Sequence, residues 1–178
     1  MVMKIDNKNN IVLIGMPGCG KSSAGVVLAK VLGYGFIDSD LMIQMREGRL
    51  LSELLRQEGL EGFLSIEDEV NAGLDVQNAV IATGGSVIYG KRAMEHLKEI
   101  GTVVYLDLPL SEIKNRLGDL AERGVAMKDG QTLDSLYLER VPLYEKYADI
   151  KVDVLGLDIR KTIEKIKEKT LNEGCVEQ

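Results

Sequence analysis

Five short segments rich in apolar residues recur along the chain and are typical of buried strands. Most of them show no regular alternation of polar and apolar positions, which favours strands that are covered on both faces. The strands predicted in this way are residues 11–15, 34–37, 79–83, 102–106 and 150–154.

The segments between these strands carry apolar residues at helical spacing. The clearest is residues 22–32, where Gly33 is placed to end the helix. A helix is expected to open at Pro109 with Ser111 as its N-cap, and Pro142 is expected to kink or break a later helix. The other predicted helices are residues 41–48, 51–59, 60–77, 91–100, 132–147 and 159–171.

Strands that alternate with helices predict right-handed βαβ units around a buried parallel sheet. We therefore expect an α/β fold with a five-stranded parallel sheet flanked by helices. The length of 178 residues fits a single domain, 1–178.

The charge balance narrows the classes of function. The chain has 22 Lys and Arg against 28 Asp and Glu, a net charge of −6, which argues against a general binder of nucleic acid or membrane surfaces. Two cysteines are too few for a disulfide scaffold. No apolar run reaches the roughly 18 residues that span a bilayer, and residues 1–10 lack the apolar core of a signal peptide. We expect a cytoplasmic, monomeric protein.

A phosphate-binding motif lies between the first strand and the first helix. Residues 15–22, GMPGCGKS, fit the pattern G-x-x-x-x-G-K-[ST] in the strand–loop–helix context that a P-loop requires. Gly15, Gly18 and Gly20 allow the backbone N–H groups to turn toward phosphate oxygens, and the helix N-terminus favours the same anion. Lys21 is expected to reach the β- and γ-phosphates of ATP, and Ser22 to bind Mg²⁺.

Two further residues of this loop are assigned to the nucleotide site. Cys19 lies inside the motif and is expected to be a small packing residue rather than a catalytic thiol. Ser23, next to Ser22, completes the expected ATP-binding set. The loop therefore predicts ATP and Mg²⁺ as the cofactors.

Two carboxylates follow the second predicted strand. Asp38 and Asp40 are two residues apart, so on an extended segment both point the same way, and the carboxyl ends of parallel strands converge on the ligand site. One carboxylate can then hold Mg²⁺-bound water while the other accepts a hydrogen bond from a substrate hydroxyl. The alternative is a solvated turn in which Asp40 caps the following helix, and the spacing alone leaves both open.

The order of several motifs resembles that of the shikimate kinases. These motifs are GMPGCGKSSAG, FIDSD, GLEGFLSIE, ATGGS, VVYLDLP and ERVPLYEKYAD, and they extend from residue 11 to about residue 154. The resemblance implies a P-loop kinase fold with an acceptor-binding helical region at about 41–77 and a lid at about 118–130. It also implies transfer of a phosphoryl group from ATP to shikimate, giving shikimate 3-phosphate.

The resemblance assigns residues to both substrates. Asp38 matches the position associated with Mg²⁺, and Asp40 the position that binds substrate hydroxyls. Gly84 and Gly85 match glycines whose backbone approaches the substrate, and Arg140 matches an arginine that binds the substrate carboxylate.

Two further arginines are assigned to the nucleotide by the same resemblance. Arg123 falls where the lid arginine of the family contacts phosphates and stabilises the transferred charge. Arg116 matches the arginine that packs on adenine. Lys21, Asp40 and Arg123 form the expected catalytic set.

The acceptor region departs from the family pattern at two positions. Leu64 replaces an arginine that forms half of the carboxylate clamp, and Ser86 replaces a third glycine. Residues 44–69 carry three arginines and seven acids, so this region sums to 3 − 7 = −4. Arg56 or Lys91 is a candidate to replace the missing arginine. The alternatives are therefore a kinase for a sugar acid, homoserine or a nucleotide, or a nucleotide-binding regulatory protein without turnover.

Overall fold

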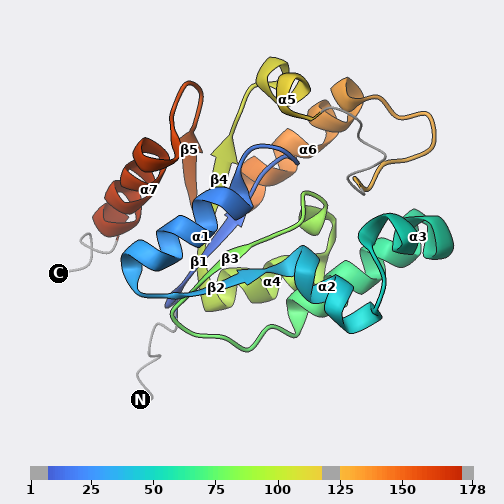
Figure 1. Cartoon of the computed structure of the whole chain (residues 1–178), viewed down its shortest axis with the longest axis horizontal. Coiled ribbons are helices and arrows are strands. Elements are labelled where there is room, and N and C mark those ends of the chain that lie inside the picture. Colours follow the sequence, from blue (N-terminus) through green and yellow to red (C-terminus); the bar gives the residue numbers. More distant parts are fainter. Residues whose placement is uncertain (1–7, 118–124, 174–178) are drawn as a thin grey trace.

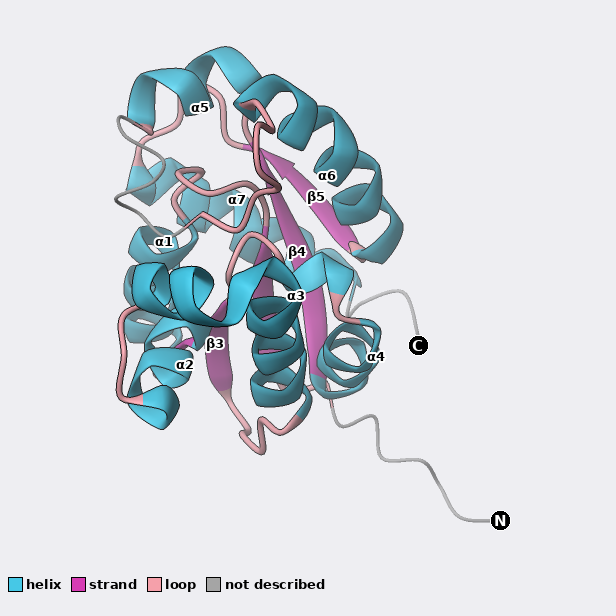
Figure 2. Cartoon of the chain, turned by 90° about the vertical axis from the view of Figure 1, so that its right-hand side faces the viewer, coloured by secondary structure: helices cyan, strands magenta, loops and turns pink. Residues whose placement is uncertain are grey.

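The computed structural model describes residues 8–117 and 125–173, and a parallel sheet forms the centre of that part of the chain (Figures 1 and 2). Its strand order is β2-β3-β1-β4-β5, and every neighbouring pair is parallel. The strands are β1 Asn10–Ile14, β2 Gly35–Asp38, β3 Ala79–Ala82, β4 Gly101–Asp107 and β5 Ile150–Asp153. The predicted five-stranded parallel sheet is confirmed, and each predicted strand overlaps an observed one.

The central strands are the most apolar because both of their faces are covered. All five residues of β1 and all four of β3 are buried, as their continuous apolar sequences indicate. In the register, Leu13 of β1 lies between Ala82 of β3 and Val104 of β4. The carboxyl ends of β1, β2 and β3 therefore meet at one edge of the sheet.

Helices cover both faces of this sheet. From β1 the chain crosses to β2 on one side, whereas from β3 it crosses to β4 on the other, so right-handed crossovers place α1 and α4 on opposite faces (Figure 1). The helices are α1 Lys21–Leu32, α2 Ser39–Glu47, α3 Leu51–Ala72, α4 Lys91–Ile100, α5 Leu110–Arg116, α6 Leu133–Tyr147 and α7 Ile159–Glu173. A short 3₁₀ helix, η1 Val87–Tyr89, was not predicted.

Two details of the helices differ from the sequence predictions, apart from where they end. The boundary expected between helices 51–59 and 60–77 is confirmed, because Gly59 is non-helical, with φ 69° and ψ 179°, and divides α3 into two segments, of which the second ends at Ala72. Ser111 lies inside α5 and is not its cap, because the extended Pro109 takes the N-cap position. The expected break at Pro142 is wrong, since α6 runs through this residue. Proline has no N–H group to donate to the carbonyl oxygen of Leu138, four residues earlier. Leu138 is exposed, so water can bind that oxygen instead.

A second, smaller apolar cluster lies apart from the main core. It joins Ile43 of α2 and the α3 residues Leu54 and Phe63 to Ala126 of the segment before α6. In Figure 1, α2 and the first part of α3 lie beyond the end of the sheet toward which β2 points. This cluster fixes the helical region near the carboxyl ends of the strands. None of the helices in the described ranges is long and apolar enough to cross a membrane.

Candidate active site

The loop between β1 and α1 has the backbone that its glycines predict. Gly15, Gly18 and Gly20 adopt φ values of 145°, 81° and 102°, which side-chain-bearing residues rarely reach. Space is also limited, because a Cβ at Gly15 would lie 2.7 Å from the carbonyl oxygen of Leu106. The loop thus opens toward the helix N-terminus at Lys21, as an anion-binding loop does.

Lys21 lies over this loop and is largely buried. Its Nζ donates hydrogen bonds to the carbonyl oxygens of Gly15, at 2.8 Å, and Met16, at 3.0 Å. The Sγ of the buried Cys19 is 3.8 Å from the same Nζ, so this side chain packs inside the loop. The ammonium group is therefore held at the mouth of the loop, where phosphate oxygens would lie.

Ser22, in the first turn of α1, contacts Asp38 at the carboxyl end of β2. Ser22 Oγ donates a hydrogen bond of 2.7 Å to Asp38 Oδ2. Asp38 Oδ1 accepts hydrogen bonds from the backbone N–H groups of Asp40 and Leu41, so Asp38 caps α2, and the alternative of Asp40 as the cap is wrong. A hydroxyl and a carboxylate close together are hard oxygen donors that fit Mg²⁺.

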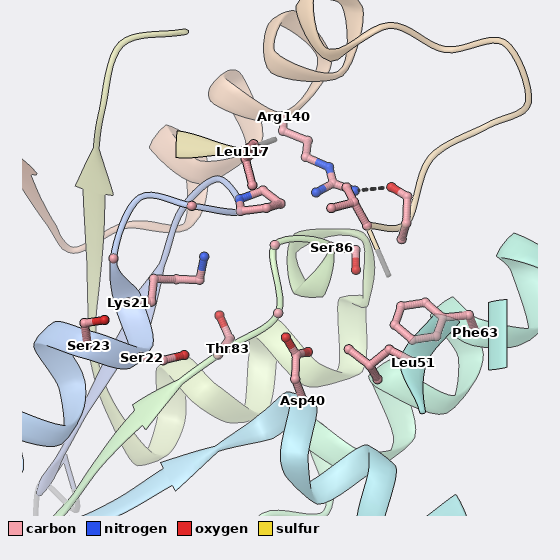
Figure 3. A pocket seen from close by; sticks show the side chains of 17 residues that line it. Lys21, Ser22, Ser23, Asp40, Leu51, Phe63, Thr83, Ser86, Leu117 and Arg140 are labelled. Carbon is pink, nitrogen blue, oxygen red and sulfur yellow. Dashed lines mark hydrogen bonds between the residues drawn. The ribbon is translucent and has the colours of Figure 1, made fainter. Parts of the chain in front are cut away.

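Asp40 lies in the first turn of α2 and points into a cavity of about 390 Å³ (Figure 3). The pKa of its carboxyl group is raised to about 6, mainly by burial. The positive charge of Lys21 lowers this pKa, and the negative charge of Asp38 raises it further. A half-buried carboxylate at this end of the sheet can accept a hydrogen bond from a ligand hydroxyl.

The same cavity brings most of the expected site residues together (Figure 3). Those that line it are Gly18, Gly20, Lys21, Ser22, Ser23, Asp40, Gly84, Gly85 and Arg140. The cavity is also lined by residues that were not predicted to belong to the site, which are Pro17, Leu51, Phe63, Thr83, Ser86, Leu117, Val125 and Ala126.

Gly84 and Gly85 form the turn after β3, against which other side chains pack closely. A Cβ on Gly84 would collide with Glu67 Oε1 and lie 2.7 Å from Asp40 Oδ1. A Cβ on Gly85 would lie 2.7 Å from Cδ of Pro17. Close approach, rather than backbone conformation, therefore requires glycine at both positions.

Arg140 of α6 is buried at the far side of the cavity, only 1% exposed. Its Nη2 donates a hydrogen bond of 2.5 Å to the carbonyl oxygen of Ala126, the bond drawn in Figure 3. Its Nε donates to Tyr89 Oη at 3.4 Å, and its guanidinium lies 5.4 Å from the centre of the Tyr89 ring. The hydroxyl of Tyr89 donates in turn to Glu139 Oε1, so several contacts fix the orientation of the arginine.

A second cavity, of about 180 Å³, lies on the other side of the P-loop. Arg116 lines it together with Gly20 and Ser23, opposite apolar residues near the start of α7 such as Leu157 and Ile159. Apolar walls and a guanidinium suit a flat aromatic group beside the phosphate loop. Arg123, the expected lid arginine, lies outside the described residues.

The sequence itself matches one family over most of its length. Residues 17–171 match the family described as "Shikimate kinase". The chain belongs to the shikimate kinase family. Proteins named shikimate kinase from Clostridium botulinum (strain Eklund 17B / Type B) and Persephonella marina are 38% and 34% identical to it, over 166 and 148 residues. These alignments cover 93% and 83% of this chain, and 99% and 90% of the relatives.

The fold comparison gives the same family. A solved structure of shikimate kinase from Acinetobacter baumannii in complex with shikimate has a TM-score of 0.87 and 31% sequence identity. It covers 96% of this chain and 97% of that chain. The P-loop kinase fold is therefore confirmed, with the sheet and helices described above.

Leu64, at the position that the resemblance assigns to a second arginine, does not line the main cavity. Leu64 packs on the cluster around Phe63 and lines a separate groove with Val125. Neither expected replacement reaches the cavity, because Arg56 lines that groove and Lys91 Nζ lies 3.7 Å from Glu95. Among the described residues, Lys21 and Arg140 are the cations that line the main cavity.

A buried acid in the acceptor region was not among the predicted site residues. Glu67 is 1% exposed, and its Oε2 accepts a hydrogen bond of 2.6 Å from Ser86 Oγ. Phe63, Glu67 and Asn71 occupy successive turns of the buried face of α3. A charged residue in the middle of such a face was the signal that could have found it. Ser86, noted only as a replacement of glycine, thus has a defined partner.

Proposed function

We propose that this protein transfers the γ-phosphoryl group of ATP to a hydroxyl group of shikimate, giving shikimate 3-phosphate. The observation that carries the proposal is the shared cavity, which has the P-loop at one end and Asp40 and Arg140 at the other. Membership of the shikimate kinase family supports the choice of acceptor.

The nucleotide half of the reaction uses the loop between β1 and α1. The loop N–H groups, including those near Gly18 and Gly20, bind the β- and γ-phosphates, and Lys21 offsets their charge. Ser22 and Asp38 hold Mg²⁺, which when bound supplies charge neutralisation for the phosphates.

The remaining contacts to the nucleotide come from beyond the P-loop. Arg116 packs against the adenine in the second cavity. Cys19 and Ser23 complete the ATP-binding set, and Arg123 is assigned to the transferred phosphoryl group. ATP then lies across the loop, with its base in one cavity and its γ-phosphate in the other.

The acceptor half is formed by residues from three elements. Arg140 binds the carboxylate of shikimate, because a guanidinium pairs with a carboxylate through two N–H groups. Asp40 accepts a hydrogen bond from the reacting hydroxyl and orients it toward the phosphorus. Gly84 and Gly85 let the acceptor approach their backbone, since a side chain at either position would occupy that space.

The surrounding segments complete the proposed enzyme. We assign residues 41–77 to the acceptor-binding region and residues 118–130 to the lid, within one domain, 1–178; residues 118–124 of this lid lie outside the described residues. Ala126, part of this lid, accepts a hydrogen bond from Arg140, so acceptor binding and lid position are linked. Closure excludes water and limits wasteful hydrolysis of ATP. The protein acts as a cytoplasmic monomer with ATP and Mg²⁺ as its cofactors.

A test of this function is ADP release measured with Mg²⁺ over a panel of acceptors. The panel contains shikimate, gluconate, homoserine and nucleoside monophosphates, and Lys21→Ala is the control because it removes the phosphate-binding ammonium. Of the acceptors in the panel, we expect only shikimate to be phosphorylated, and we expect Lys21→Ala to abolish this turnover. Turnover with another acceptor instead would replace shikimate in the proposal, and no turnover with any acceptor would favour a regulatory nucleotide-binding protein.

A further inference from the structure

A buried carboxyl group lies directly behind the acceptor cavity and has only one of its oxygens satisfied. Glu67 Oε2 accepts from Ser86 Oγ at 2.6 Å, and Ser86 itself lines the cavity. Glu67 Oε1 has no hydrogen-bond partner among the described residues, and it occupies the space that a side chain on Gly84 would need. Asp40 Oδ1 borders the same space. An unpartnered acidic oxygen thus faces the wall of the site.

The two acidic side chains that follow Glu67 on α3 are engaged elsewhere. Asp68 accepts from the N–H group of Ala93 at 2.7 Å, and Glu69 pairs with Arg46 at 2.9 Å. The residue one helical turn before Glu67 is Leu64, so no cation lies there to pair with it.

Three charged groups reach Glu67 from the other elements. Asp40 of α2 opposes its ionisation, whereas Arg140 of α6 and Lys21 of α1 favour it. Burial is the largest effect, and together these influences raise the pKa of Glu67 to about 8, although the hydrogen bond from Ser86 lowers it. Near neutral pH this carboxyl group therefore carries a proton.

We propose that Ser86 and Glu67 form a specificity pair behind the acceptor cavity, in which the neutral form of Glu67 admits an acceptor carboxylate beside Arg140. The proposal rests on the proposed function, because it concerns a carboxylate-bearing acceptor of that same site. Glu67 acts through the electrostatic potential in the cavity. It touches neither the nucleotide nor the reacting hydroxyl group, so it is a positioning residue.

The charges of the site explain why the neutral form is needed. An acceptor carboxylate and ionised Asp40 balance Arg140 and Lys21, before the nucleotide is counted. Ionised Glu67 adds a third negative charge at a site where little water is present to screen it. In a single-arginine cavity this charge weakens the binding of an anionic acceptor, whereas a second cation nearby would have offset it.

The test is the acceptor KM measured from about pH 6.5 to about pH 9.5, with the KM for ATP measured in parallel. Since only the neutral fraction of Glu67 binds the acceptor well, the acceptor KM should rise above pH 8, approaching tenfold per pH unit. Glu67→Gln cannot ionise and accepts the same hydrogen bond from Ser86, so its acceptor KM should stay flat. Ser86→Ala removes the donor that favours ionisation, so its rise should begin at higher pH.

Two further measurements keep the outcome decisive. Calorimetric binding of shikimate without nucleotide should show the same pH dependence in the wild type and none in Glu67→Gln, and thermal unfolding should show that both variants are folded. The carboxamide analogue of shikimate, which lacks the negative charge, should show no rise in the wild type.

The inference is overturned by a flat acceptor KM in the wild type, by an equal rise in Glu67→Gln, or by an onset in Ser86→Ala at lower pH. Absence of any turnover with shikimate is a different result, since it would contradict the proposed function itself.

Discussion

The Nη2 atom of Arg140 donates a hydrogen bond of 2.5 Å to the carbonyl oxygen of Ala126, so the arginine of the acceptor cavity is tied to the segment before α6. The same segment reaches α6 a second time, because Lys128 Nζ and Gln131 Nε2 both contact Glu139 Oε2, at 3.3 and 3.0 Å. These contacts join the position of the segment to the orientation of the arginine.

Replacing Arg140 by lysine should separate charge from geometry. Lysine keeps the positive charge but lacks the planar guanidinium group. In Arg140 this group binds the Ala126 carbonyl oxygen through Nη2 and places Nη1 near Gly85. Loss of one charge-assisted pair corresponds to about 1.5–3 kcal/mol, so we expect the KM for shikimate to rise about 10–150-fold. Steady-state kinetics should show a nearly unchanged KM for ATP. An unchanged acceptor KM would remove Arg140 from the acceptor site.

The hydroxyl group of Tyr89 should matter through Arg140. Tyr89→Phe keeps the ring under the guanidinium but removes the oxygen that joins Arg140 Nε to Glu139. The bond from the Arg140 guanidinium is long, at 3.4 Å, so we assign it the about 0.5–1.5 kcal/mol of an ordinary hydrogen bond and expect the acceptor KM to rise about 2- to 12-fold with little change in kcat. Tyr137→Phe, on the same helix as Arg140 but outside the cavity lining, is the matched control. Equal effects of the two variants would contradict this role.

The turn after β3 should not tolerate a side chain. In Gly84→Ala the new methyl group collides with Glu67 and approaches Asp40, so one of these carboxyl groups must move. We expect a loss of about 1–3 kcal/mol in the free energy of unfolding and a raised acceptor KM. Gly35→Ala is the control, because its methyl group would meet only ordinary contacts, the closest at 3.8 Å from Ala79. Urea denaturation and kinetics of both variants check the prediction, and similar stabilities would contradict it.

The buried Glu67 should also make the free energy of unfolding depend on pH. Its pKa is about 8 in the folded protein against an ordinary value of 4.5, so above the ordinary value the folded state binds a proton that the unfolded chain has lost. From about pH 6.5 to about pH 8 the free energy of unfolding should therefore fall, by at most about 1.4 kcal/mol per pH unit from this group.

Glu67→Gln carries no titrating proton at this position, so the wild type should lose stability relative to the variant across this range. The difference should level off once Glu67 ionises in the folded state as well. Urea denaturation of both proteins at several pH values measures it. Parallel stability curves would mean that Glu67 is already ionised in the folded protein.

Much of the fold follows from local sequence signals. The P-loop glycines, the apolar run of β1 and the stop at Gly33 each act over a few residues, so pattern alone locates them. The boundary at Gly59 in α3 was predicted for the same reason, and helical segments lie on both sides of it.

The parts that sequence reasoning missed depend on contacts between distant residues. Glu67 and Ser86 are 19 positions apart, and their pairing depends on how α3 packs beside the turn after β3. The absence of Leu64 from the cavity lining likewise depends on its packing near Phe63, which no local pattern specifies. Such residues are found from burial in the folded chain, because their chemistry is ordinary until water is removed.

The two carboxylates at the end of β2 are close in sequence, but we expect their substitution to affect different steps of the reaction. Asp38 contacts Ser22 at 2.7 Å and caps α2, whereas Asp40 points into the acceptor end of the cavity. Asp40→Asn keeps the shape of the side chain and removes its charge. We expect kcat to fall about 10²- to 10⁴-fold, the usual contribution of a positioned base, with the Kd for ATP nearly unchanged.

Asp38→Asn should instead raise the Mg²⁺ concentration needed for half-maximal rate, because an amide oxygen is a weaker ligand than a carboxylate. Titrating Mg²⁺ and shikimate separately in each variant distinguishes the two roles. The assignment requires that Asp40→Asn lowers kcat at saturating Mg²⁺ and that excess Mg²⁺ restores much of the rate of Asp38→Asn. If instead Asp40→Asn turned over normally, or both variants responded alike to Mg²⁺, the division of roles between these two residues would be wrong.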